Sequence, residues 1–192
     1  MGSTTRLSEE EYWDWRDEFT DLGDDPVASL IEKLNDDNIA VRWKAAWALG
    51  KIGDTHAVDP LIASLDFTGP IVMGEGTFTL NMVAAWALGK LKDPRAVEPL
   101  IQGLSSACSD YVWVSAWALG EIGDPRAIGP LEEAREREEF ECVWQGDASW
   151  TGRGPDPAEN VVLTAITERT FHGPETPVER ALEKLGEKRD YT

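Results

Sequence analysis

Hydrophobic and small residues follow a helical period in three near-copies of one segment. The first copy reads Val-Arg-Trp-Lys-Ala-Ala-Trp-Ala-Leu-Gly-Lys-Ile-Gly-Asp over residues 41–54, and related copies return at 82–91 and 113–124. The Ala-Leu-Gly tripeptide within them recurs at spacings of 39 and then 31 residues. A period of this length is typical of one helix pair per repeat in a stacked array.

A shorter segment lies between the copies and repeats with them. It reads Ala-Val-Asp-Pro-Leu-Ile at 57–62, Ala-Val-Glu-Pro-Leu-Ile at 96–101 and Ala-Ile-Gly-Pro-Leu-Glu at 127–132. Each unit therefore has one helix of each kind. The sequence predicts an all-α fold, a right-handed α-solenoid with two irregular loop insertions, that forms one domain over residues 1–192.

Capping signals set the expected helix boundaries. Ser8 with Glu11 has the spacing of a capping box, Asp25 precedes a first-turn proline, and Gly53 ends the first central helix before Asp54 begins the next. We divide the chain into an N-terminal cap helix (8–20), repeats (24–139), a degenerate loop (140–157) and C-terminal cap helices (158–192). The expected helices span 8–20, 26–34, 39–52, 55–65, 80–91, 94–104, 110–122, 125–139, 158–170 and 178–188.

Two connections are too irregular to be helical. Residues 66–79 contain three glycines, a proline and β-branched residues, which suit an ordered loop or a small hairpin. Residues 145–155 are too rich in glycine for a helix interior. Both insertions occupy the same kind of connection, two units apart, so we expect them to emerge at the same edge of the solenoid.

A helical wheel at about 100° per residue divides the central helix into faces. One side gathers Val41, Ala45, Ala48, Leu49 and Ile52, which we expect to contact the partner helix. The remaining side holds two tryptophans at i and i+4, with lysines beside them. The three copies would align five tryptophans and a methionine in a stripe across the array. The candidate binding residues on this face are Trp43, Lys44, Trp47, Lys51, Met82, Trp86, Lys90, Trp113, Trp117 and Glu121.

The pattern Val-Arg-x-x-Ala-Ala-x-Ala-Leu-Gly-x-Ile-Gly-Asp, followed by Pro-Arg-Ala-Val-x-Pro-Leu-Ile, resembles the short HEAT-like repeat first named from phycobilisome lyases. The resemblance covers about residues 24–134. In that family the four x positions of the second helix vary and line a concave surface. The resemblance thus implies that the tryptophan stripe faces a groove.

Two other arrangements of the stripe remain open. Aromatic residues at helical spacing are ordinarily core, although Val, Ala, Leu and Ile already fill the expected core positions. Alternatively, the insertions at 66–79 and 140–157 fold over the stripe and form lids or walls.

The net charge of the chain argues against nucleic-acid and membrane partners. The chain has 36 acidic and 18 basic residues, a formal net charge of -18, so its field repels nucleic-acid backbones and anionic bilayers. The acidic, lysine-poor balance suits a high-salt cytoplasm. The first residues lack an apolar leader and the two cysteines form no disulfide framework, so we expect a cytoplasmic location.

No catalytic or cofactor site is predicted. One enzyme of this repeat family, deoxyhypusine hydroxylase, binds iron through His-Glu pairs at the first two x positions, where this chain has Trp43-Lys44 in its first copy and no His or carboxylate in the others. His56 and His172 are the only histidines, and residues 146–154 lack the ending of a phosphate-binding loop. We therefore expect no catalytic residue, no metal and no cofactor.

The sequence-level hypothesis is a non-catalytic scaffold or adaptor that grips a protein or peptide partner in the tryptophan-lined groove. The acidic surroundings favour a partner with Arg or Lys. Two alternatives stay open. One is a bilin lyase or chromophore chaperone, which the resemblance permits. The other is a homodimer or larger homo-oligomer through the stripe.

Overall fold

The computed structural model describes Phe19 and residues 22–67, 70–73, 76–106, 109–137 and 176–187. The predicted cap helix at 8–20, apart from Phe19, and the predicted loop at 140–157 and helix at 158–170 lie outside these residues. The described residues include both helices of each of the first three repeats, the helix that begins at Ile128 and the last helix, Pro177–Glu187.

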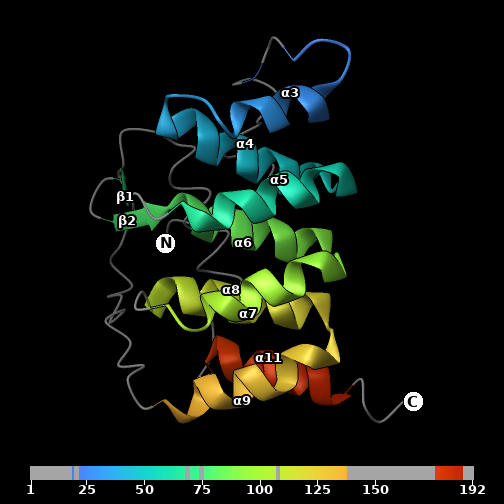
Figure 1. The fold of residues 1–192 in the computed structure, drawn as a ribbon, viewed down its shortest axis with the longest axis vertical. Helices are drawn as coiled ribbons and strands as arrows, with labels where there is room; N and C mark the ends of the chain where they lie inside the picture. The colour runs from blue at the N-terminus through green and yellow to red at the C-terminus, as the bar shows by residue number, and fades with distance from the viewer. Residues whose placement is uncertain are drawn as a thin grey trace, which may run out of the picture.

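The described helices form two layers (Figure 1). The first layer, here called the A layer, comprises α3 (Pro26–Lys33), α5 (Val58–Ala63), α7 (Val97–Gly103) and α9 (Ile128–Glu136). The second, the B layer, comprises α4 (Ile39–Ile52), α6 (Leu80–Leu91), α8 (Ser109–Ile122) and α11 (Pro177–Glu187). Each A helix packs on the B helix that follows it, and successive B helices pack on one another. The predicted all-α solenoid is confirmed.

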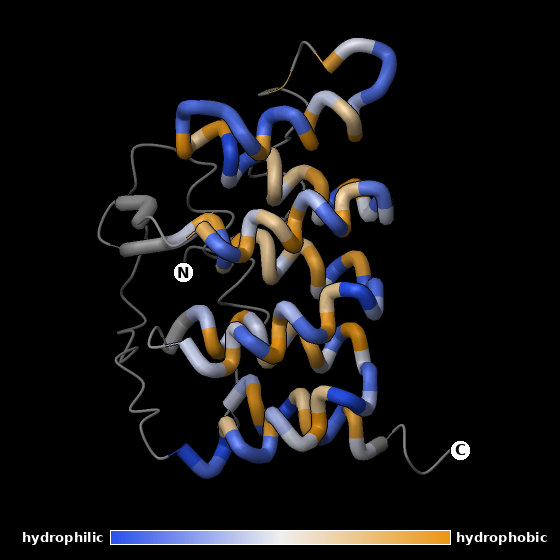
Figure 2. The backbone as a smooth tube through the Cα atoms, viewed as in Figure 1, coloured by the Kyte–Doolittle hydropathy of each residue, from blue (hydrophilic) through white to orange (hydrophobic). Residues whose placement is uncertain are grey.

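Aspartates in the turns between pairs start the A helices. Asp54, Asp93 and Asp124 each accept a hydrogen bond from the backbone N–H two residues on, and a 3₁₀ turn follows each. These turns are η1 (Thr55–Ala57), η3 (Pro94–Ala96) and η4 (Pro125–Ala127), while η2 (Ser64–Asp66) ends the helix of the second pair. The polar residues of these turns gather at the right edge of the view in Figure 2.

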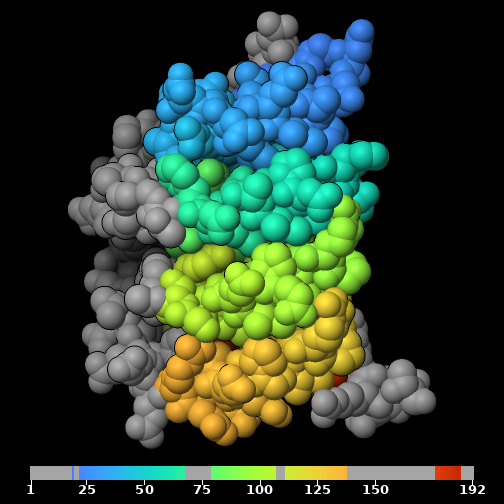
Figure 3. Space-filling view, viewed as in Figure 1, coloured from blue at the N-terminus to red at the C-terminus, as the bar shows by residue number. Residues whose placement is uncertain are grey.

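The core lies between the two layers. One leucine of each A helix is fully buried at the same place in its pair, and these are Leu30, Leu61, Leu100 and Leu131. From the central helix, Ala45, Ala48 and Leu49 are fully buried as predicted, and Val41 and Ile52 pack against the core while partly exposed. Figure 3 shows the successive pairs as bands along the long axis.

Helix α11 completes a fourth pair, which the sequence did not predict. A Cβ at Gly50 would lie 2.8 Å from Ala87 Cα, a Cβ at Gly89 would lie 2.9 Å from Ala118 Cα, and a Cβ at Gly120 would lie 2.9 Å from Ala181 Cα. Ala181 therefore holds on α11 the place that the earlier alanines hold on α6 and α8. In α4, α6 and α8 the closely approached glycine stands two residues after an alanine of the same helix. On α11 the residue two positions after Ala181 is the exposed Glu183.

The insertion at 66–79 contains a β-hairpin, as expected. Strands β1 (Pro70–Met73) and β2 (Gly76–Thr79) pair antiparallel, with Ile71 opposite Phe78. The hairpin joins α5 to α6, so it lies on the edge where the helices within a pair connect, at the left of Figure 1. Helix α9 also ends on that edge. The second insertion, 140–157, lies outside the described residues, so its place at the same edge stays a prediction. None of the described helices is long and apolar enough to cross a membrane.

Candidate interaction face

The tryptophan stripe does not line an open groove. Trp43 and Trp47 are 1% exposed, Trp86 is 2% exposed and Met82 is 3% exposed. Trp113 and Trp117, on α8, remain partly exposed. The expectation that all six side chains point into an open groove is therefore wrong for four of them.

The rings are buried because they span the gap between successive B helices. The Trp47 and Trp86 rings stack with centroids 6.0 Å apart and an interplanar angle of 7°. A Cβ on Gly50 would lie 2.9 Å from Cζ3 of Trp86, and a Cβ on Gly89 would lie 2.7 Å from Cζ3 of Trp117. Each indole thus covers the glycine of the preceding pair. A helical wheel shows one helix alone and cannot reveal that a neighbouring helix fills this space.

Lysines lie over the rings of the stripe. Lys51 Nζ is 5.2 Å from the centroid of Trp47, and Lys90 Nζ is 5.4 Å from Trp86 and 5.7 Å from Trp117. These distances are typical of cation–π contacts. Both lysines are exposed, so their stems cover apolar ring surface while the ammonium groups reach solvent. We call Trp47, Lys51, Trp86, Lys90 and Trp117 the Trp-Lys row.

Lys44 lies beside the row and is mostly buried. The residue as a whole is 8% exposed, and its Nζ lies 5.6 Å from the Trp43 ring centroid. The predicted site residues of the first pair are thus brought together. Only Lys51 among them is exposed.

Glu121 continues the row on α8, where the earlier pairs have Lys51 and Lys90. It accepts from Lys92 Nζ at 3.1 Å and from Lys184 of α11. Burial raises the pKa of Glu121, but the hydrogen bonds from Lys184 and Lys92 outweigh it, so the pKa lies below its ordinary value. This carboxylate joins the third and fourth pairs at the end of the row.

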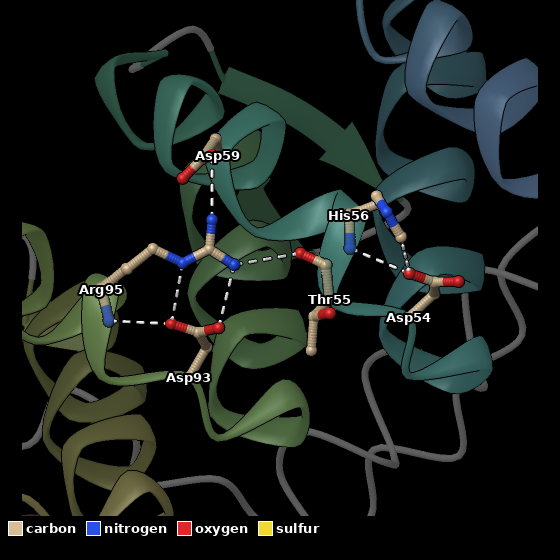
Figure 4. Close-up of polar contacts among 6 residues, drawn as sticks. All are labelled: Asp54, Thr55, His56, Asp59, Asp93 and Arg95. Atoms are coloured by element: carbon tan, nitrogen blue, oxygen red, sulfur yellow. Dashed lines mark hydrogen bonds and ion pairs between the residues drawn. The ribbon is translucent and has the colours of Figure 1, made fainter.

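A second set of polar contacts joins the A layer, and the sequence analysis missed it (Figure 4). Arg95 donates to Asp93 in its own turn and, through Nη1, to Asp59 of the preceding A helix at 2.9 Å. Arg95 Nη2 also donates to the carbonyl of Thr55 at 3.2 Å. The guanidinium therefore binds the preceding pair at both a side chain and the backbone.

The same arrangement recurs one pair later. Arg126 donates to Asp124, to Glu98 of α7 at 3.3 Å and to the carbonyl of Pro94 at 3.3 Å. The side-chain hydrogen bond from Arg126, with its backbone N–H, holds the pKa of Asp124 below its ordinary value. We call these contacts the Arg ladder. The repeated Asp-Pro-Arg tripeptide, with an acid in the preceding helix, was the signal in the sequence.

The Arg ladder does not extend to the first pair. His56 replaces arginine in η1, at the start of the second pair, and its Nδ1 lies 2.7 Å from Asp54 within its own turn. The backbone N–H of His56 is the main cause that lowers the pKa of Asp54. Ala28 of α3 holds the place of Asp59 and Glu98, so the carboxylate and the arginine are replaced together. In the part of the chain that the structure describes, no group of three His, Cys, Asp or Glu side chains could hold a metal ion.

Paired helices in register, with periodic glycines and capped turns, define an α-solenoid repeat protein. A family model of HEAT repeats matches residues 18–75 and 77–143, which is more than half of the chain. The chain belongs to the HEAT-repeat family, and the predicted HEAT-like repeat is confirmed.

The solved structures that match this chain include a phycocyanin lyase complex. It is the complex of CpcE and CpcF of phycocyanin lyase from Nostoc sp. PCC7120, with a TM-score of 0.56 and 24% sequence identity. The match covers 99% of this chain and 69% of that chain. A search among curated proteins finds no match.

Proposed function

We propose that this chain is a non-catalytic scaffold that binds a protein or peptide partner on its B layer, at the Trp-Lys row and the adjoining Trp113 and Glu121. The observation that carries the proposal is the continuous run of contacts from Lys51 through Trp47, Trp86 and Lys90 to Trp117. Ring surfaces held by the fold and long cationic side chains together offer contact area at low ordering cost.

The burial of the rings changes which residues would contact a partner. Trp47 and Trp86 support the surface from beneath, whereas Lys51, Lys90 and the partly exposed Trp113 and Trp117 form it. A homodimer through the stripe would have less aromatic surface to bury than the sequence suggested. The proposed site is thus smaller and more polar than a tryptophan-lined groove.

Trp117→Ala tests the proposal. We expect the variant to lose capture of its partner from the native source about tenfold or more, as truncation of a tryptophan hot spot does. Capture is measured by crosslinking followed by mass spectrometry, with circular dichroism to confirm that the variant is folded. Replacing Trp47 or Trp86 is a poorer test because these buried rings support the packing.

Ile101→Ala is the matched control, since Ile101 is also a partly buried side chain packed on the core but belongs to the A layer. It should retain capture. Equal loss in both variants, or unchanged capture by a folded Trp117→Ala chain, would contradict the proposal.

A second candidate is a bilin lyase or chromophore chaperone. The fold shared with a phycocyanin lyase complex favours it. If mixing the chain with a bilin shifts the absorption band, and Trp117→Ala abolishes the shift, the aromatic face serves a tetrapyrrole instead of a peptide.

A further inference from the structure

Helix α11 carries no aromatic ring at the place where the other B helices carry one. The alanines that lie against the glycine of the preceding pair come directly after Trp86 on α6, Trp117 on α8 and Arg180 on α11. Residue 180 is thus the fourth member of a series that begins with Trp47. An indole is present in the first three pairs, and an arginine replaces it in the last.

The surroundings of the glycines show the same difference. A Cβ at Gly50 or at Gly89 would lie 2.9 or 2.7 Å from the indole of the next pair. At Gly120 the three nearest described atoms all belong to Ala181, and the third of them is 3.8 Å away. Among the residues that the structure describes, therefore, no ring covers Gly120.

The missing ring is not compensated by a closer approach of α11. The Cα of Ala181 would lie 2.9 Å from a Cβ on Gly120, against 2.8 and 2.9 Å for the equivalent alanines at the two earlier contacts. Lys184 binds Glu121 and holds α11 against α8 one turn further along. Because the spacing is equal and a ring is missing, the place of that ring is left to the long, partly exposed side chain of Arg180.

We call this place, beside Trp117 and over Gly120, the fourth ring position. Trp47 and Trp86 are 1% and 2% exposed, and their rings stack with centroids 6.0 Å apart. Trp117 has Lys90 of α6 over its ring at 5.7 Å but remains partly exposed. We attribute its exposure to the missing ring on α11, since a ring there would cover Trp117 as Trp86 covers Trp47.

We propose that a tryptophan side chain of the partner fills the fourth ring position and stacks on Trp117. This inference rests on the proposed function and names the residue that anchors the partner. An indole fits because the fold itself places indoles at the equivalent positions, and stacked rings attract each other beyond the area that they bury. Tryptophan is also enriched among the side chains that dominate binding. Arg180 moves aside by rotation about its side-chain bonds.

Arg180→Trp tests whether the position accepts a ring. Arg180→Ala is the matched control, because it removes the same arginine contacts and adds no ring. The tryptophan variant should melt about 2–4 °C above the alanine variant, since its indole stacks on Trp117. Thermal unfolding followed by circular dichroism measures the difference. Arg180→Phe, with a smaller ring, takes its place if Arg180→Trp does not fold. Equal melting temperatures of the ring variant and the alanine variant would overturn the inference.

The binding test uses N-acetyl-fluorotryptophanamide as the probe and the full chain, with broadening of the fluorine NMR line as the measure. The unaltered chain and Arg180→Ala should broaden the line. Arg180→Trp should lose this broadening, because its own indole occupies the position. N-acetyl-trifluoroleucinamide, which is apolar and has no ring, is the control probe and should not distinguish the variants. Absence of broadening by the unaltered chain, or equal broadening by the two variants, would contradict the inference.

Partner capture separates this inference from the proposed function. Arg180→Trp should reduce capture about tenfold or more, as Trp117→Ala does, whereas Arg180→Ala should retain it. If Trp117→Ala abolishes capture and Arg180→Trp leaves it intact, the scaffold function stands and the tryptophan anchor is wrong. If both variants leave capture intact, the proposed function fails as well.

Discussion

Two glycines of the B helices determine how closely successive pairs approach. Gly50 and Gly89 each face an alanine backbone and an indole ring of the next pair, and a Cβ at either would lie 2.7–2.9 Å from their atoms. Contacts that short do not occur between real side chains. The indoles can be buried because these positions lack a side chain, so the glycines and the tryptophans of the stripe form one packing arrangement.

Gly89→Ala tests this arrangement. The added methyl group must displace the Ala118 backbone or the Trp117 ring, and overpacking of this kind costs about 1–3 kcal/mol. Urea denaturation followed by tryptophan fluorescence measures the change in free energy of unfolding. Gly129→Ala is the control, because nothing lies within 4 Å of its Cβ, and it should be neutral or stabilising by up to about 1 kcal/mol. Equal stability of the two variants would show that the B helices move apart without cost.

At the level of the elements, the Arg ladder links the A layer while the glycine contacts link the B layer. Asp93 has two roles, since it caps the 3₁₀ turn η3 through the Arg95 N–H and pairs with the Arg95 guanidinium. The side-chain hydrogen bond from Arg95 is the main cause that lowers the pKa of Asp93. A carboxyl with a lowered pKa stabilises the fold above its unfolded-state pKa, about 3.9, and loses that contribution as the pH falls through the folded-state pKa.

Asp93→Asn should separate the two roles. Asparagine caps about as well as aspartate, so the variant loses only the charge, at a cost of at most about 1 kcal/mol at pH 7 for this surface pair, in which Arg95 is exposed and Asp93 partly buried. The difference from the unaltered chain should shrink as the pH falls below about 4, since the aspartate also becomes neutral. Urea denaturation at several pH values measures it. Asp93→Ala should cost about 1 kcal/mol more at every pH, and a difference that does not depend on pH would exclude the ion pair as its source.

Helix boundaries could be predicted well from the sequence because they depend on nearby residues. Asp54 and Gly53 mark where one helix ends and the next begins, and α4 and α6 have the predicted bounds. The place of α11 could not be predicted in this way, because 40 residues separate it from α9 and its link to the repeats is the approach of Ala181 to Gly120. The Arg ladder could have been predicted from the recurring Asp-Pro-Arg turns.

The candidate site was predicted only in part, because neighbouring helices decide which of its side chains are exposed. The positions on one face of α4, α6 and α8 do come together, as the helical period implies. Their exposure depends on the adjacent pair, and stacking of Trp47 on Trp86 removes both from solvent. A sequence pattern within one helix carries no information on how closely the adjacent helix approaches it.

For the whole molecule, the balance of charge opposes compactness. The chain carries 36 acidic and 18 basic residues, and the ion pairs of the Arg ladder that join successive pairs, Arg95–Asp59 and Arg126–Glu98, lie between exposed side chains. Exposed pairs contribute little to stability, whereas repulsion among unpaired acids acts over the entire surface. Added salt weakens both, and we expect the repulsion among the acids to be the larger of the two.

We therefore expect the melting temperature at pH 7 to rise as NaCl is raised from about 20 mM to 1 M, because the Debye length falls from over 20 Å to about 3 Å. Each kcal/mol of repulsion relieved should raise the melting temperature by about 2–4 °C in a chain of this length. Thermal unfolding followed by circular dichroism measures the shift. The same titration near pH 4.4, the isoelectric point, is the control, because no net charge is left to screen and salt should then give little increase. A melting temperature that falls steadily with NaCl at pH 7 would show instead that the attractive pairs, including the Arg ladder and the contacts of Glu121, outweigh the repulsion.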